Sequence, residues 1–461
     1  MTPIEVVDNN NYALTWKRFR SYLNLNSMRS AFADQSETFL RKGLCVTGCS
    51  ILDTRYKTFL NPASWWKSVL SISYQLEVTD PSSGVGATQL LFAQIYLGGR
   101  SHEAYRKVQP VSHCVQGAVH LPALDMIVWR FPDDPSLAHL PDATEPQRVI
   151  PHLPVQHLPI GVNNATDLFS VNRTIIRYKP NKCCATQFGL QGEPNRSLPS
   201  FSLFGKTFRT RRKAQDVATR INTLWDVHKR SPERITLAEP LGYAPPINTI
   251  WQRWVEGSPL ATMLNADNYE RYLDATARGL ATVHDVTLSA SPVFALHDHL
   301  AETRKKCAKL SQAFPLHTDT LEALAQRLER LAAGLPESRP QLIYGDFHVD
   351  QLLVSAKQVV FLDFDSFATG DVEQDLAEFI VDLQFRGFGT ELSEEMCAYF
   401  VDTYQSHANS LVSLQRLNWH ILVQLVYRAY HLYVRLVPNL DAEVANVLAT
   451  IRRFELEAHF Y

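Results

Sequence analysis

Three oxygen-bearing side chains lie beside two short apolar runs in the C-terminal half of the chain. Asp346 precedes the first run, Gln351 begins it, and Asp363 follows the second. Because Ala356-Lys357-Gln358 separates the runs as a turn, we expect a hairpin that brings Gln351 and Asp363 to neighbouring ends, facing one cavity. Phosphoryl transfer needs an acid group that orients and deprotonates a hydroxyl, and oxygen ligands that hold Mg²⁺ against the phosphates. Asp346, Gln351 and Asp363 supply such a set.

The segment around these residues resembles the three-part signature of the aminoglycoside phosphotransferase and choline kinase-like family. The family pattern is H-G-D-x-x-x-x-N, then I-D-x-D/E, then G-D-x-x-x-D-L-A. In this chain it reads Tyr344-Gly345-Asp346 with Gln351, then Leu362-Asp363-Phe364-Asp365, then Gly370-Asp371 and Asp375-Leu376-Ala377. Three parts at consistent gaps are far more specific than any one of them.

The resemblance implies a role for each matched residue. Asp346 is the expected catalytic base, Gln351 and Asp363 are the expected magnesium ligands, and Asp375 is expected to brace the catalytic loop. Asp365 is either a neighbour of the metal ligands or a substrate contact. ATP and Mg²⁺ are the implied cofactors.

Two positions depart from the family pattern. Tyr344 replaces the usual histidine, and Gln351 replaces the usual asparagine. An amide oxygen one methylene further out can still bind magnesium, and maltokinases and related bacterial sugar kinases are similar to this chain in using glutamine there. The change affects the metal geometry and leaves the assignment of the base alone.

The nucleotide side is expected upstream of this segment. Lys206 lies in an apolar strand of residues 201–208, which precedes a predicted helix of residues 211–228, and it resembles the lysine that kinases direct at the α and β phosphates. An acidic partner for Lys206 is left open between Asp216 and Asp226.

Two further segments are expected to border the nucleotide. The turn of the hairpin at residues 178–182 is expected to cover the phosphates, although it contains no glycine-rich motif. The stretch of residues 251–257 resembles the hinge between kinase lobes, where main-chain groups of Arg253 and Val255 pair with adenine. The alternative for this stretch is an ordinary core strand.

The acceptor is expected to be a small molecule. Only eleven residues separate Asp363 from Asp375, which leaves no room for the long segment that holds a peptide in protein kinases. The layout, with a strand-rich region before the kinase-like part, is similar to maltokinase-like and glucosamine kinase-like proteins and favours a sugar or amino sugar. Aminoglycoside antibiotics, choline-like alcohols and homoserine-like amino acids stay open.

The elements that position these residues form three predicted units. Residues 40–132 are strand-rich, residues 132–159 are rich in Pro, His and Leu without a period, and the chain after residue 268 is mainly helical. We therefore expect an α+β chain with a protein-kinase-like bilobal fold, made of a small antiparallel N-lobe and a mainly helical C-lobe. The predicted units are a cap domain with an antiparallel sheet and linker at 1–160, the N-lobe at 161–257, and the C-lobe with the catalytic loop at 258–461.

Composition limits the partners and the compartment. The 461 residues include 45 Lys and Arg and 47 Asp and Glu, so we expect no nucleic acid partner. The seven cysteines show no metal-ligand spacing and the first residues lack a signal-peptide pattern, which predicts a reduced, cytoplasmic protein. The most apolar long stretch, residues 417–437, is interrupted by His420, Gln424, Arg428 and Arg435, so we expect no membrane span.

Two other functional classes compete with an active kinase. The two departures from the family pattern are compatible with a nucleotide-binding regulator that has lost catalysis, and the N-terminal region is compatible with a scaffolding protein. Retention of Asp346, Asp363 and Lys206 favours the catalyst, because loss of catalysis usually removes one of these roles.

Overall fold

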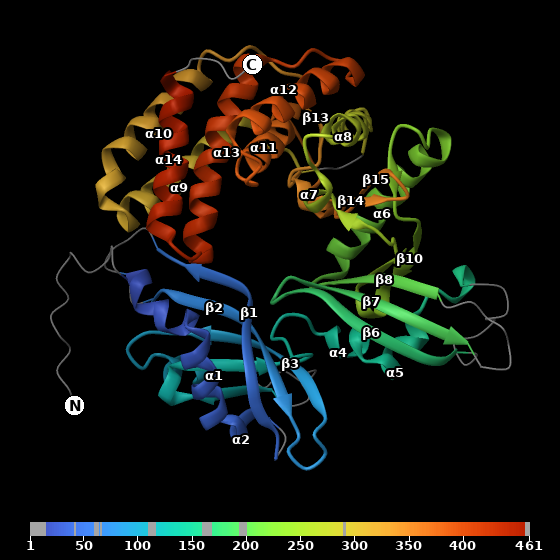
Figure 1. Ribbon diagram of the computed structural model, residues 1–461, viewed down its shortest axis with the longest axis vertical. Helices are drawn as coiled ribbons and strands as arrows, with labels where there is room; N and C mark the ends of the chain where they lie inside the picture. The colour runs from blue at the N-terminus through green and yellow to red at the C-terminus, as the bar shows by residue number, and fades with distance from the viewer. Residues whose placement is uncertain are drawn as a thin grey trace.

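A computed structural model of the chain describes residues 15–40, 43–59, 64, 67–108, 117–158, 168–192, 201–288 and 292–456. Figure 1 shows an N-terminal sheet in blue and teal, a second sheet in green, and a helical part in yellow to red. A cavity lies between the green sheet and residues 351–365 of the helical part.

The N-terminal sheet has five antiparallel strands in the order β1-β2-β3-β5-β4. Their bounds are β1 (Cys45–Lys57), β2 (Val69–Thr79), β3 (Gly86–Ile95), β4 (Ala118–Leu121) and β5 (Met126–Arg130). Alternate residues of β2 from Leu70 to Val78 are buried, as expected for a strand with one face in a core. That core also contains Phe32 of α1 (Leu25–Asp34), whose ring lies 5.1 Å from the ring of Tyr74.

The segment after this sheet packs against the protein instead of forming a free linker. It contains the short helices α4 (Leu140–Thr144) and α5 (Pro146–Val149), and Leu140 and Val149 are fully buried. The predicted boundary between residues 160 and 161 lies outside the described residues, so the division into domains stays a prediction.

The second sheet also has five antiparallel strands, in the order β10-β11-β8-β7-β6. They are β6 (Leu168–Lys179), β7 (Cys183–Gly192), β8 (Phe201–Phe208), β10 (Pro240–Ala244) and β11 (Thr249–Arg253). Helix α6 (Arg211–Arg230) follows β8 and begins at Thr210, whose side chain accepts a hydrogen bond from the amide of Lys213.

The helical part carries two small sheets among its helices. The helices are α7 (Leu260–Met263), α8 (Tyr269–His284), α9 (Leu296–Ala313), α10 (Thr318–Ala332), α11 (Val372–Gln384), α12 (Thr390–His407), α13 (Leu414–Arg435) and α14 (Leu440–Leu456). In the first small sheet, β14 (Leu352–Ser355) pairs with β15 (Gln358–Phe361) and with β12 (Ser258–Pro259), and β9 (Thr236–Leu237) runs parallel to β15. In the second, β13 (Gln341–Ile343) pairs with β16 (Ala368–Gly370). Within the described ranges, no helix is both long enough and apolar enough to cross a bilayer.

These elements confirm the predicted α+β class, with a small antiparallel sheet next to a mainly helical part and a further sheet before both. The N-terminal sheet contacts the other two parts. Its Tyr56 ring lies 5.6 Å from the ring of Tyr433 in α13, and the Phe131 ring, just after β5, lies 5.2 Å from Tyr178 in β6. Asp53 of β1 also forms an ion pair with Arg435 of α13.

Candidate active site

The loop from β13 to β14 carries Asp346 and is held by Asp375 of α11. The buried carboxylate of Asp375 accepts hydrogen bonds from the amides of Tyr344 (2.5 Å) and Gly345 (2.8 Å). Gly345 has a φ of 79°, and a Cβ there would lie 2.5 Å from the carbonyl oxygen of Ser366. The turn before Asp346 therefore requires glycine at position 345, and the buried carboxylate of Asp375 fixes the amides of Tyr344 and Gly345.

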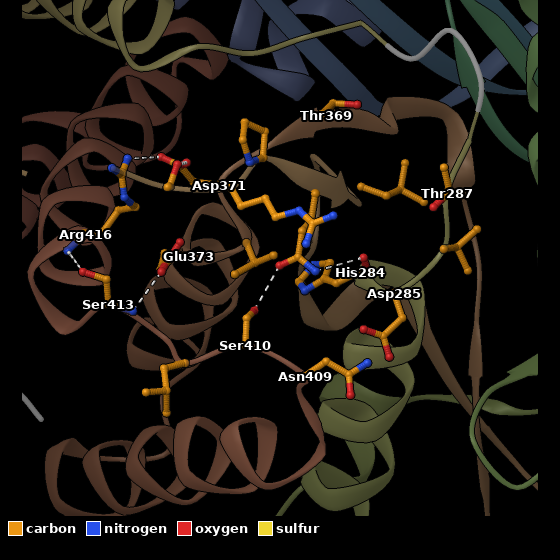
Figure 2. A pocket seen from close by; sticks show the side chains of 18 of the residues that line it. His284, Asp285, Thr287, Thr369, Asp371, Glu373, Asn409, Ser410, Ser413 and Arg416 are labelled. Atoms are coloured by element: carbon orange, nitrogen blue, oxygen red, sulfur yellow. Dashed lines mark hydrogen bonds and ion pairs between the residues drawn. The ribbon is translucent and has the colours of Figure 1, made fainter. Parts of the chain in front are cut away.

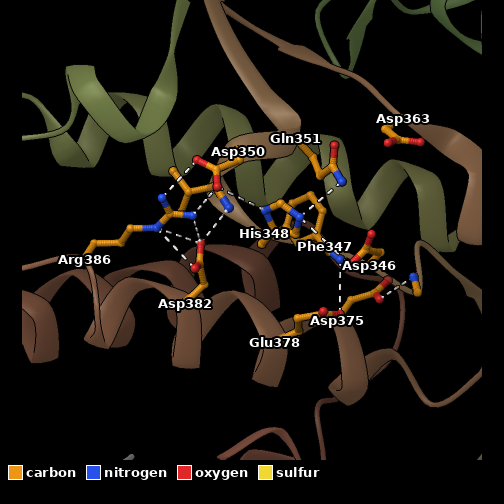
Figure 3. A network of polar contacts seen from close by, with 12 residues as sticks. Asp346, Phe347, His348, Asp350, Gln351, Asp363, Asp375, Glu378, Asp382 and Arg386 are labelled. Atoms are coloured by element: carbon orange, nitrogen blue, oxygen red, sulfur yellow. Dashed lines mark hydrogen bonds and ion pairs between the residues drawn. The ribbon is translucent and has the colours of Figure 1, made fainter. Parts of the chain in front are cut away.

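Two more acids of α11 hold the rest of this loop (Figure 3). Glu378 accepts a hydrogen bond from the amide of Phe347 (3.2 Å), and Asp382 accepts one from the amide of Val349 (3.0 Å). Asp375, Glu378 and Asp382 are spaced three and four residues apart, so they lie on one helix face. Burial raises the pKa of Glu378 well above its usual value, and the neighbouring carboxylates raise it further.

An ion-pair network fixes the outer end of the loop. Arg386 donates to both oxygens of Asp350 at 2.9 and 2.7 Å, and it also contacts Asp382 at 2.8 Å. The planar guanidinium suits such bidentate pairing with a carboxylate. Figure 3 shows this network at the opposite end of the loop from Asp346 and Asp363.

The strands β14 and β15 form the hairpin predicted from the sequence. The amide of Leu362 donates to the carbonyl of Gln351 at 2.9 Å, which places Gln351 beside Asp363 at the open end of the hairpin. Both side chains line one cavity. The side-chain amide nitrogen of Gln351 also lies 3.2 Å from Nε2 of His348.

Lys206 of β8 bridges the two carboxylates that follow β15. Its Nζ lies 2.7 Å from Asp363 Oδ1 and 2.7 Å from Asp365 Oδ2, and its side chain is 8% exposed. Burial lowers the pKa of Lys206, but Asp365 and Asp363 outweigh burial and raise it above its usual value. Burial raises the pKa of Asp363, yet the charge of Lys206 and its hydrogen bond bring it down to about 2. Asp363 is therefore ionised at neutral pH.

Neither acid of α6 that the sequence left open is paired with Lys206 in the described residues. Asp216 lies 4.0 Å from Arg212 and Asp226 lies 2.7 Å from Lys229, both within the helix. The partners of Lys206 come instead from the segment after β15.

Helix α6 contributes cations to this segment. Lys213 Nζ and Arg220 Nη1 both donate to the main-chain carbonyl of Asp365, the second at 3.1 Å. Burial raises the pKa of Asp365, and so does the charge of Asp363, in spite of Lys206. The helix thus fixes the backbone of Asp365, while its side chain contacts Lys206.

A cavity of about 310 Å³ lies between the second sheet and the hairpin. Lys206, Gln351 and Asp363 line it together with Arg253 and Val255. Apolar side chains form most of the remaining wall: Ile176, Ala185, Phe204, Val217, Ile221, Ala238, Ile250, Leu353, Leu362 and Phe364. The structure therefore gathers five of the six predicted site residues around one cavity.

The sixth predicted residue, Asp346, lines an adjoining cavity of about 490 Å³. Its side chain is 45% exposed. Arg177, Lys179 and Gln351 line both cavities and form the wall where they meet. The far side comes from α13, which supplies Gln424, Tyr427, Arg428, His431, Leu432 and Arg435.

A third cavity, of about 460 Å³, shares no lining residue with these two (Figure 2). There Arg416 lies 2.6 Å from Asp371, the motif residue before α11, and His420 lies 3.1 Å from it. Burial opposes ionisation of Asp371, but hydrogen bonds from His420 and Ser338 lower its pKa. Asp371 thus joins α11 to α13 at a distance from Lys206 and Asp346.

Sequence reasoning missed the side chains that support the loops. Glu378 and Asp382 follow Asp375 at helical spacing, and this pattern was the available signal. The contacts of Lys213 and Arg220 with a main-chain carbonyl had no signal, because they depend on where α6 lies relative to a hairpin more than a hundred residues later.

Comparisons with known proteins identify the region that contains this site. Residues 204–409 match the model described as the phosphotransferase enzyme family. A search of curated proteins found no match.

Solved structures similar to this chain include aminoglycoside and choline kinases. A thermostable mutant of the aminoglycoside phosphotransferase APH(4)-Ia is 15% identical, with 63% of this chain and 96% of that chain covered and a TM-score of 0.45. Choline kinase from Cryptosporidium parvum Iowa II is 11% identical, with coverages of 68% and 96% and a TM-score of 0.47. Choline kinase LicA from Streptococcus pneumoniae is 13% identical, with coverages of 62% and 93% and a TM-score of 0.43.

The matched segment contains Lys206, Arg253, Asp346, Gln351 and Asp363. The family resemblance predicted from the sequence is confirmed by this match: residues 204–409 fit the model of the phosphotransferase enzyme family.

Proposed function

We propose that the chain is an ATP- and Mg²⁺-dependent kinase that transfers the γ-phosphoryl group to a hydroxyl of a small molecule, a sugar or amino sugar. One observation carries this proposal: the buried ion pair between Lys206 and Asp363, residues 157 positions apart, lies in a cavity that meets a second one containing Asp346. A phosphate-binding cation, a carboxylate for the metal and a base are thus collected at one junction.

The smaller cavity suits the nucleotide. Its largely apolar walls can enclose a purine ring, and Lys206 at its inner end can bind phosphate oxygens. The amide of Arg253 donates to the carbonyl of Glu239 at 2.8 Å. Pairing with the purine edge therefore falls to the carbonyl of Arg253 and the amide of Val255.

The donor set beside this cavity fits Mg²⁺. Asp363 offers an ionised carboxylate and Gln351 an amide oxygen, and magnesium usually takes only one or two protein carboxylates because phosphate and water oxygens complete its octahedron. Bound there, Mg²⁺ would neutralise charge on the transferred phosphoryl group.

Asp346 is the group placed to accept the proton of the acceptor hydroxyl. It lines the larger cavity close to Gln351, which borders both cavities, so an alcohol bound there faces the nucleotide. Carboxylate, guanidinium, amide and imidazole groups line this cavity, and they match the donors and acceptors of a hydroxyl-rich molecule. A cavity of about 490 Å³ accommodates a small molecule.

The proposal is tested first by calorimetry of ATP binding with and without Mg²⁺. Phosphate transfer is then measured with a panel of sugars, amino sugars, aminoglycosides and choline. Metal-dependent ATP binding with transfer to a sugar or amino sugar supports the proposal. Binding without transfer to any acceptor supports the catalytically impaired regulator, and no ATP binding contradicts both.

The variant Asp346→Asn separates binding from chemistry. Removing the base should lower transfer at least about a hundredfold, while ATP affinity stays close to that of the wild type.

Lys206→Met should instead weaken ATP binding, because the cation for the phosphates is lost. Lys229→Met, on the exposed face of α6, is the matched control and should change neither quantity.

A further inference from the structure

Asp134, in the segment after the N-terminal sheet, is a fully buried carboxylate that accepts at least four hydrogen bonds within the described ranges. Oδ1 accepts from the amides of Ser136 (2.7 Å) and Leu137 (2.9 Å), which closes its own turn. Oδ2 accepts from the hydroxyl of Tyr178 (2.7 Å) and from the amide of Asn181 (2.9 Å). The two oxygens therefore serve two different segments of the chain.

The segment bound by Oδ2 is the tip of the β6–β7 hairpin. Lys179 pairs with Cys183, so the tip consists of Pro180, Asn181 and Lys182, and Asn181 has a φ of 62°. An asparagine tolerates this left-handed conformation, and a fixed acceptor for its amide selects one orientation of the tip.

Apolar packing supports the same attachment. The buried side chains of Phe92, Trp129 and Phe131 from the N-terminal region form one cluster with Tyr178 and Cys184 of the hairpin. The N-terminal sheet thus covers the part of the hairpin next to its tip, and Asp134 adds polar contacts at the tip itself.

The tip lies next to the two cavities of the candidate site. Arg177 and Lys179 line both of them. Burial, Arg55 and Lys179 lower the pKa of Lys182, whereas the charge of Asp346 raises it. The hairpin therefore presents cations above the carboxylates of the site.

We propose that Asp134 is a positioning residue through which the N-terminal domain fixes the β6–β7 hairpin over the nucleotide phosphates. This inference rests on the proposed function for the identity of the ligand. The role of the N-terminal domain is then to hold in place a hairpin that lacks the glycines of a flexible phosphate loop.

The variant Asp134→Asn tests this role selectively. Its side-chain oxygen can keep the two bonds to Ser136 and Leu137, while its NH₂ group replaces Oδ2 and cannot accept from the amide of Asn181. Hydrogen exchange at Asn181 in the nucleotide-free protein should accelerate about tenfold. ATP affinity should fall about tenfold with adenosine affinity unchanged, because adenosine has no phosphates to meet the hairpin.

Two further variants keep the test independent of overall folding. Tyr178→Phe retains the ring beside Phe131 and loses one hydroxyl donor, so it should show the same changes at about threefold. Asp125→Asn alters a carboxylate of the N-terminal sheet whose two oxygens accept from the amides of Gly99 and Ser101, far from the hairpin, and it should show neither change.

The outcomes separate the inference from the proposed function. The inference is overturned if Asp134→Asn has the same hydrogen exchange at Asn181 and the same ATP affinity as Asp125→Asn. It is also overturned if Asp134→Asn loses ATP and adenosine affinity equally. A wild-type protein that binds no ATP overturns the proposed function and the phosphate contact together. The exchange experiment then still decides whether Asp134 anchors the hairpin.

Discussion

Helices α11 and α6 both support the candidate site, and they do so with opposite charge. Helix α11 presents acids that accept hydrogen bonds from main-chain amides of the loop before β14. Helix α6 presents Lys213 and Arg220, which donate to a main-chain carbonyl after β15. In each case the helix binds backbone, so the loop's own side chains, Asp346 and Asp363, stay available to the cavities.

The two supports differ in burial. The contacts of Asp375 are buried at the centre of the helical part, whereas Lys213 is half-buried at its edge. Hydrogen bonds withdrawn from water cost more to break because the groups left behind remain unsatisfied. We therefore expect the acids of α11 to contribute more to the free energy of unfolding than the cations of α6.

The largest effect is expected for Asp375→Ala. The substitution leaves the amides of Tyr344 and Gly345 buried without an acceptor, so the free energy of unfolding should fall by about 4 kcal/mol. Urea denaturation followed by circular dichroism measures this change. Asp402→Ala, at an exposed position of α12, is the control and should stay within about 0.5 kcal/mol of the wild type. Equal stabilities of the two variants would show that α11 does not support the loop.

A smaller effect is expected for Lys213→Met. The variant keeps the aliphatic volume but removes one donor to the Asp365 carbonyl, which should cost about 1 kcal/mol of unfolding free energy. Lys229→Met on the same helix loses only an exposed pair with Asp226 and should change stability by less than about 0.5 kcal/mol. The comparison fails if Lys213→Met is no more destabilising than Lys229→Met.

The smallest effect is expected for Glu378→Gln below pH 4.5, where Glu378 is protonated in both the folded and the unfolded state, and the effect should grow as the pH rises. The pKa of Glu378 is raised in the folded state, so its contribution to stability is complete below its ordinary value of 4.5 and is lost as the pH rises toward the folded value. Glutamine stays neutral and loses nothing in that range. The unfolding free energy of the variant relative to that of the wild type should therefore increase as the pH rises above about 4.5 toward the folded-state pKa of Glu378. Parallel stability curves would mean that burial does not hold a proton on Glu378.

Much of the fold was predictable because its signals are local. The strand-forming residues between 40 and 132, and the turn between the two apolar runs around residue 357, identified strands that the structure contains. The segment of residues 132–159 was harder to predict, because its short helices have no period and are held by tertiary packing of Leu140 and Val149.

The candidate site was predictable in its motif residues but not in their supports. Asp346, Gln351 and Asp363 are close in sequence, and the pairing of β14 with β15 brings the segments that carry them together. The acidic partner of Lys206 was left open between Asp216 and Asp226, and the structure pairs it instead with two acids of the segment after β15. Such a partner depends on the packing of two sheets, which local spacing does not determine.

The contacts of the N-terminal region with Phe314, just after α9, and with α13 bear on how the chain can be shortened. Trp16 and Tyr56 share one continuous apolar cluster with Phe314 and Tyr433. A fragment that begins after β5 would expose the rings of Phe314 and Tyr433 to water, and exposed hydrophobic surface of this kind promotes aggregation. Expression of the phosphotransferase region alone without aggregation should thus require polar replacements at Phe314 and Tyr433. The first third of the chain therefore cannot be removed without changing the surface of the rest.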